Sequence, residues 1–161
     1  MVQKIFVFIT IIALSMLLFL YLYTRIQTSR INEFKDLVIT LERTVCYGTC
    51  PIYKLTLDGD GRVIYEGEEH VRVIGTSTTQ ISLRRVKKIV SEFYNVDYFS
   101  LKDDYLEWDI TDMPGAITAI TINGKTKTIR HYHGDKSAPK ELTKLEDRID
   151  EIVGSQRWIG K

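Results

Sequence analysis

Residues 116–133 read AITAITINGKTKTIRHYH, with Asn123-Gly124 between two runs of β-branched and alternating residues. Asn-Gly between such runs is the strongest short-range signal for a β-hairpin, because both positions of a type I′ turn require positive φ. This stretch therefore predicts two antiparallel strands, over residues 116–122 and 125–133, joined by a two-residue turn.

Upstream of this hairpin, alternating apolar residues predict four more strands. Asp58-Gly59-Asp60-Gly61 lies between the second and third of them and indicates a hairpin turn. It lacks the later ligands of a calcium loop, since Arg62 and Val63 follow it. The predicted strands cover residues 37–43, 53–57, 62–66 and 70–74.

Two segments show the spacing of amphipathic helices. Apolar residues recur at steps of 3, 4 and 3 in both, first at Leu83, Val86, Val90 and Phe93 and later at Leu142, Leu145, Ile149 and Ile152. The element order is then ββββ-α-ββ-α. This order predicts an α+β fold, an antiparallel β-sheet with two amphipathic helices on one face.

The N-terminal region carries a long apolar run, Ile5–Tyr23, with no charged residue. Nineteen helical residues span about 28 Å, close to the hydrocarbon thickness of a bilayer. The run is longer than the core of a signal peptide and is not followed by a small-x-small cleavage site. We therefore predict a single-pass signal-anchor, one N-terminal transmembrane helix with its juxtamembrane segment over residues 1–30, rather than a cleaved signal. Residues 31–161 form a single domain.

The charge of that domain is balanced. Once Lys4, Arg25 and Arg30 are set aside, 19 basic residues stand against 21 acidic ones. A nucleic-acid-binding domain requires a strongly basic face, so we expect no nucleic-acid partner. The few cations beside the apolar run give at most a weak preference for a cytoplasmic domain.

Cys46 and Cys50 are the two cysteines of the chain and lie in Cys46-Tyr47-Gly48-Thr49-Cys50-Pro51. So close a pair, with glycine between and proline after, favours a small disulfide loop, which persists in an oxidising compartment. This favours an extracytoplasmic domain. A metal pair and reactive thiols stay open as alternatives, although the C-x-x-x-C spacing differs from the thioredoxin motif and a zinc site needs further ligands.

Several stretches of this domain resemble a known family: LERTVCYGTCPIY (41–53), DGDGRVIYEG (58–67), FSLKD (99–103) and ITINGKTKTIR (120–130). Together with the closing helix they are similar to a prokaryotic family of uncharacterised domains that carry a C-Y-G-x-C-P motif. The similarity covers about residues 37–158. It implies a frequent secreted or membrane-attached context and supplies no catalytic residues.

His131 and His133 lie two positions apart on a predicted strand, so both imidazoles point to one face, about 7 Å apart. This spacing suits two ligands of one metal ion. Asp109, Asp112 or His70 could complete the site, but a lone H-x-H is more often a half-buried strand end. We therefore expect no metal and no cofactor, with His131 and His133 as the alternative.

The segment between the two halves of the domain, residues 98–114, mixes aromatic and acidic residues. A long loop of this composition is typical of a binding surface, for which we name Tyr105, Trp108, Asp109 and Asp112. Packed aromatics with solvated acids are the alternative.

The sequence shows no catalytic triad elbow, phosphate loop or dinucleotide fingerprint. We expect a non-enzymatic interaction module, membrane-anchored and bound to a protein or envelope partner. The alternative is a metal-dependent enzyme using His131 and His133, or a thiol-redox enzyme using Cys46 and Cys50.

Overall fold

The computed structural model describes residues 11–25, 34–107 and 112–160. The chain divides into two compact units, Met1–Lys35 and Asp36–Lys161. We describe each unit by itself.

The first unit contains a helix over residues 11–25. Within the described ranges, no helix combines the length and the apolar character needed to cross a membrane. The prediction of a transmembrane helix over residues 5–23 is therefore wrong for the part that is described. Residues 1–10 and 26–30 of the predicted anchor and juxtamembrane segment lie outside the described residues.

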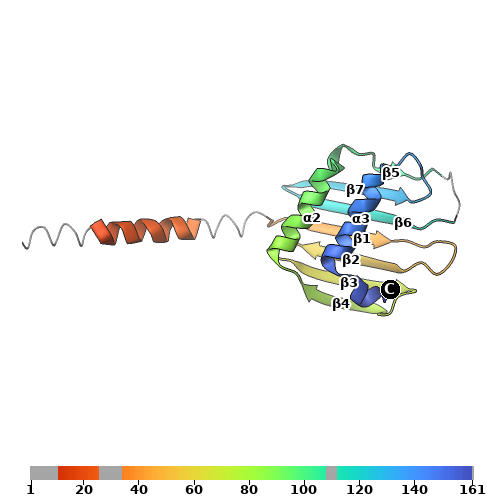
Figure 1. Ribbon diagram of the computed structural model, residues 1–161, viewed down its shortest axis with the longest axis horizontal. Helices are drawn as coiled ribbons and strands as arrows, with labels where there is room; N and C mark the ends of the chain where they lie inside the picture. Colours follow the sequence, from red (N-terminus) through yellow and green to blue (C-terminus); the bar gives the residue numbers. More distant parts are fainter. Residues whose placement is uncertain (1–10, 26–33, 108–111, 161) are drawn as a thin grey trace, which may run out of the picture. The chain divides into compact units, whose positions relative to one another are not determined.

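The second unit is built on a seven-stranded sheet with the order β4-β3-β2-β1-β6-β7-β5 (Figure 1). Neighbouring strands are antiparallel except for β5, which runs parallel to β7. The strands are β1 (Val38–Arg43), β2 (Ile52–Asp58), β3 (Arg62–Glu69), β4 (Gly75–Gln80), β5 (Asp104–Tyr105), β6 (Gly115–Ile122) and β7 (Lys125–Tyr132).

Turn chemistry accounts for the two predicted hairpins. Asn123 and Gly124 take φ values of 52° and 71°, as a type I′ turn between β6 and β7 requires. Between β2 and β3, the Asp58 carboxylate accepts the amides of Asp60 and Arg62 at 3.1 and 2.9 Å. These bonds add to the backbone hydrogen bond from the Gly61 amide to the Asp58 carbonyl at 3.0 Å, and such side-chain bonds are why aspartate favours turns.

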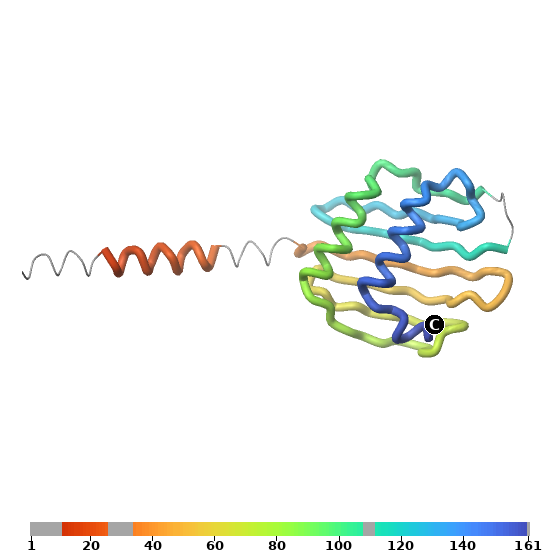
Figure 2. Tube along the Cα trace, viewed as in Figure 1, coloured from red at the N-terminus to blue at the C-terminus, as the bar shows by residue number. Residues whose placement is uncertain are grey.

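The helices are α2 (Leu83–Asn95), η1 (Tyr98–Ser100), α3 (Lys140–Val153) and α4 (Gln156–Ile159). The two long helices, α2 and α3, cross the same face of the sheet (Figures 1 and 2). The predicted apolar positions of α3 are all buried. In α2, the predicted core residue Leu83 is 48% exposed, and Ile89, which the spacing did not include, is buried. The core lies between these helices and the inward residues of the strands, Ile39, Leu41, Leu55, Leu57, Val63, Ile120 and Ile129 among them.

Two features of the predicted fold are wrong. The sheet is mixed rather than antiparallel, because β5 pairs in parallel with β7 at one edge. The sequence did not predict β5, since a strand of two residues is too short to show apolar alternation. The expected fourth strand at residues 70–74 is a turn. The amides of Arg72 and Val73 in that turn donate to Ile159 and Trp158 of α4, and the edge strand β4 follows as the polar run GTSTTQ.

Candidate functional site

Two histidines lie where β7 ends. His131 faces the helices because strand side chains alternate and Ile129 is also buried on that face. His133 follows the strand, and its amide donates to the Pro114 carbonyl at 3.0 Å. The two imidazole rings are thereby brought to a centroid distance of 4.7 Å. The sequence prediction that both rings share one face is confirmed by this geometry.

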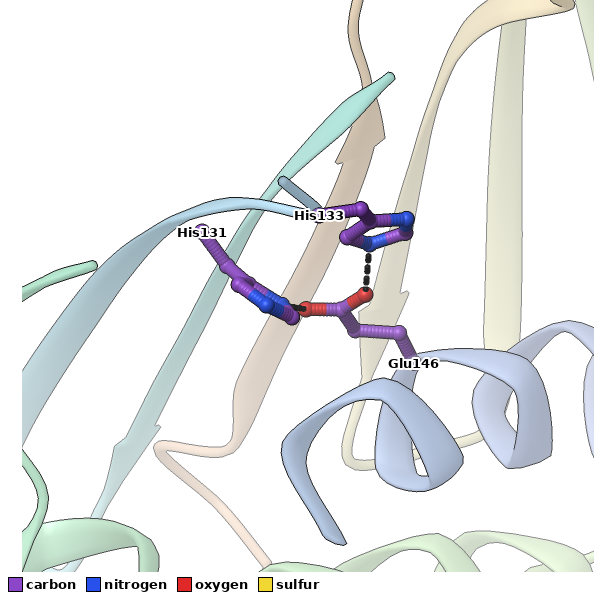
Figure 3. A group of neighbouring side chains, drawn as sticks. All are labelled: His131, His133 and Glu146. Carbon is purple, nitrogen blue, oxygen red and sulfur yellow. Dashed lines mark hydrogen bonds and ion pairs between the residues drawn. The ribbon is translucent and has the colours of Figure 1, made fainter. Parts of the chain in front are cut away.

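Glu146 of α3 meets both imidazoles (Figure 3). His131 Nδ1 lies 2.8 Å from Oε1 of Glu146, and His133 Nε2 lies 2.7 Å from Oε2. The side chain of Glu146 is fully buried, that of His131 is 3% exposed and that of His133 is 15% exposed. Glu146 therefore occupies a core position, four residues after the buried Leu142 on the sheet-facing stripe of α3.

Arg43, at the end of β1, joins this group to the next turn of α3. Its Nη1 donates to Glu146 Oε2 at 3.3 Å, and its Nε and Nη2 donate to Asp150 Oδ2 at 3.2 and 3.0 Å. Nη2 also donates to Asp147, which is exposed. We refer to Arg43, His131, His133, Glu146 and Asp150 as the ion cluster.

Asp150 is the second buried carboxylate of the ion cluster. The Tyr53 hydroxyl donates to it at 2.8 Å and the Ser155 hydroxyl at 2.6 Å. Burial, and next the charge of Asp150, raise the pKa of Tyr53 above its usual value, so the phenol keeps its proton and stays a donor.

The buried charges of the ion cluster are held ionised by one another. Burial alone would raise the pKa of Glu146, but the hydrogen bonds of His131 and His133 outweigh it and hold this pKa below its usual value. Burial alone would lower the pKa of Arg43, but Asp150 foremost among its neighbours raises it, so the guanidinium stays charged. Glu146 and Arg43 therefore both carry charge at neutral pH.

A cavity of about 290 Å³ opens beside the ion cluster. Arg43, His133 and Asp150 line its polar side, and Pro51, Pro114 and Ile159 contribute apolar surface. A concave site that combines apolar walls with a few convergent polar groups is the usual form of a ligand pocket.

The disulfide loop forms part of the same wall. Cys46 and Cys50 are bonded, with their Cα atoms 5.8 Å apart, and Cys50 lines the cavity. The predicted disulfide is thus present in the structure. Between the two cysteines, Tyr47 is 87% exposed at the tip of the loop.

Residues 37–153 match the model of the family described as "Domain of unknown function (DUF6438)". The chain belongs to this family. The match covers every strand, α2 and α3, and so includes the whole ion cluster. No curated protein matches the chain. The family resemblance seen in the sequence is confirmed as membership of an uncharacterised family, while the C-Y-G-x-C-P motif and the prokaryotic origin stay predictions.

The predicted binding surface of this family member falls partly outside the described residues, because Trp108 and Asp109 are not described. Tyr105 is 5% exposed and packs edge-on against His131, with 6.3 Å between ring centroids. Asp112 is exposed, in a turn with φ of 70°. Tyr105 therefore supports the ion cluster from within the core rather than offering an outer surface.

Of the residues considered as a third ligand in the metal alternative, Asp109 lies outside the described residues. His70 lies in the turn after β3, next to Glu69, and does not belong to the ion cluster. The residues that the sequence analysis missed are Arg43, Glu146 and Asp150. A signal for the last two was present, since Leu142, Glu146 and Asp150 are spaced by four and share one helical stripe with the core.

Proposed function

We propose that this domain is a binding module that captures a positively charged group in the cavity beside the ion cluster. The observation that carries the proposal is the charge at the cavity. Two buried carboxylates meet one buried guanidinium there: Asp150 lines the cavity, Glu146 lies directly behind it, and Arg43 contacts both.

A further carboxylate strengthens this excess. Asp135 is 5% exposed, and hydrogen bonds from Ser137 and the Glu107 amide lower its pKa, with a smaller contribution from the nearby His131. A buried charge that is not fully paired is unfavourable, and a cation entering the cavity would relieve it.

The proposed compartment is oxidising and therefore extracytoplasmic. The Cys46–Cys50 disulfide supports this proposal, because such bonds persist where glutathione and thioredoxin do not reduce them. The proposed partner is a protein or envelope component with an accessible basic group, and binding needs no catalytic step.

Blocked amino acids test the proposal on the full chain in a buffer with chelator. N-acetyl-lysine amide and N-acetyl-arginine amide are titrated against N-acetyl-glutamate amide, and the shifts of the Thr44 and Gln156 amides are followed by NMR. We expect saturable shifts with a Kd below about 1 mM for the basic probes and none for the acidic probe.

Two substitutions locate the binding. Gln156→Trp places a large side chain at an exposed position that lines the cavity, and we expect it to abolish binding. Lys144→Trp, at a position of α3 that is 73% exposed, is the matched control and leaves binding unchanged. Equal shifts with the acidic probe, no shifts at all, or an unaffected Gln156→Trp variant would each refute the proposal.

The thiol-redox alternative has one observation in its favour, since Cys50 borders the cavity. Thiol titration of the protein purified from its native compartment tests it. A disulfide that stays fully formed through exposure to a glutathione redox buffer at cytosolic poise contradicts a reactive pair.

A further inference from the structure

We propose that this domain also binds a divalent transition-metal ion of the zinc type, through His131, His133 and Glu146. This inference goes beyond the proposed function, because the metal would be held by the three side chains themselves and not by the cavity. Within the described residues, these three side chains form the group of potential metal ligands that converge, each with one donor atom and all donor atoms within 4.8 Å of one another.

The donor set selects the class of metal. Two imidazole nitrogens and one carboxylate oxygen suit zinc and its first-row neighbours, whereas calcium and magnesium prefer sets made of oxygen alone. Two histidines and one glutamate are also a set that zinc uses when a fourth position is left for water or a ligand.

The geometry needs only a small adjustment. The donor atoms are now 2.7 and 2.8 Å apart in their hydrogen-bonded pairs. Ligands of a tetrahedral zinc ion, each at about 2.0–2.1 Å from the metal, lie about 3.3 Å from one another. The hydrogen-bonded pairs would open by about half an ångström, and the longest separation among the three donor atoms, which is within 4.8 Å, would shorten by up to about 1.5 Å. Changes of this size are within the reach of side-chain rotation.

Metal binding would replace two hydrogen bonds by two coordinate bonds. In the hydrogen-bonded state, Nδ1 of His131 and Nε2 of His133 donate to the Glu146 carboxylate. In the metal-bound state each of these nitrogens gives up its proton, to the other ring nitrogen or to solvent, and becomes a ligand. Glu146 enters as a carboxylate in both states.

The surroundings have the form of a supporting shell. Arg43 donates to Glu146 Oε2 at 3.3 Å and is itself fixed by Asp150, which leaves Oε1 to face the metal. Such outer contacts orient ligating groups and tune the affinity of a metal site. His133 also lines the cavity, which offers room for a water molecule or a ligand group at the fourth position.

The alternative is a clamp in which two imidazoles and Arg43 satisfy a buried carboxylate and no metal binds. Titration of the chelator-treated full chain with Zn²⁺ and Co²⁺ separates the two. We expect one ion per chain by elemental analysis, and the visible absorption of four-coordinate cobalt when Co²⁺ is the probe.

Three variants assign the site. His133→Ala and Glu146→Gln should weaken Zn²⁺ binding by at least about 100-fold, since the loss of a supporting contact alone costs 10- to 100-fold. His70→Ala removes a histidine that is 40% exposed in a turn after β3 and should change the affinity less than twofold. Far-UV circular dichroism checks that each variant is folded. If a variant fails to fold, the cobalt spectrum of the unsubstituted protein still tests whether the metal binds.

Each outcome is decisive. No saturable binding of Zn²⁺ or Co²⁺ by the folded chain overturns the inference, and so does binding that His133→Ala and Glu146→Gln leave intact. The lysine-amide titration in chelator then decides the proposed function separately. If that probe binds while the metals do not, the cavity holds a basic group and the clamp description is correct.

Discussion

Replacing Arg43 by Met removes a guanidinium that is 14% exposed and touches three carboxylates. The variant keeps the volume and the apolar stem of the side chain. It leaves Glu146 fully buried without its guanidinium donor and Asp150 with only its hydroxyl donors. Breaking a buried ion pair by removing one partner destabilises a protein by about 3–5 kcal/mol, because the remaining charge is uncompensated.

A loss of this size is a large part of the stability of a small domain, which is about 5–15 kcal/mol. Urea unfolding of the full chain, followed by tryptophan fluorescence, measures it. With a urea dependence of about 2 kcal/mol per molar, the midpoint should fall by about 2 M. Arg130→Met is the matched control. Its pair with Asp104 is about half exposed on both sides, and it should cost less than about 1 kcal/mol.

The double variant Arg43→Met/Asp150→Asn adds a second test. If the damage arises from an uncompensated carboxylate, removing that charge restores part of the loss, and the two substitutions are less than additive. Equal midpoints for Arg43→Met and Arg130→Met would refute the reasoning, since the ion cluster would then contribute no more than a surface pair.

Three further outcomes are expected. The pKa of Glu146 is held below its usual value in the folded state, so the stability that this carboxylate contributes is complete above about pH 4.5 and is lost as the pH falls through the folded pKa. In urea midpoints measured across acidic pH, Glu146→Gln should therefore reduce the slope below about pH 4.5. An unchanged slope would contradict this expectation. The Cys46→Ser/Cys50→Ser variant should lose about 2 kcal/mol of unfolding free energy, as expected for so short a disulfide loop. Dithiothreitol should lower the stability of the unsubstituted protein by the same amount. A large effect of dithiothreitol on the variant would show that the loss does not come from this disulfide. Tyr98→Phe removes a buried hydroxyl that lies 2.7 Å from both the carbonyl and the hydroxyl oxygen of Thr118. Thermal unfolding should show a loss of about 1–2 kcal/mol of stability, because the Thr118 oxygens lose a donor. A neutral result would mean that water replaces that donor.

Local signals in the sequence predicted much of the sheet and both long helices. Asn123-Gly124 and the Asp58 turn determine their hairpins through backbone conformations that few other residues adopt. The stripe of α3 is predicted because its period of 3.6 residues is strong over fourteen residues. These elements need no information from distant parts of the chain.

Other parts depend on contacts that sequence spacing does not report. β1 lies at the centre of the sheet between β2 and β6, a pairing across more than seventy residues. β4 is polar because it forms an edge, and β5 has only two residues, so neither shows apolar alternation. The alternating run at residues 70–74 was misleading because its amides bond to α4 instead of a strand.

The candidate site shows the same division. The H-x-H pair predicted two imidazoles on one face, since strand alternation is a local property. The spacing of α3 places Glu146 on the core-facing stripe of the helix, but its meeting with the two histidines depends on how α3 packs across the sheet, which spacing along the chain does not report. Asp109 and Asp112 were considered instead because they are acidic residues of the irregular segment that precedes the hairpin.

The ion cluster is difficult to explain by stability alone. Buried ion pairs can often be replaced by apolar residues of similar volume with little loss, or with a gain, because desolvation offsets their attraction. On α3, Glu146 and Asp150 occupy stripe positions where leucine would pack against the sheet, as Leu142 and Ile149 do. Fold formation would be satisfied by such residues, whereas capture of a cation requires the carboxylates. The presence of charge on the inner face of α3, beside a cavity and two imidazoles, is therefore better explained by binding than by folding.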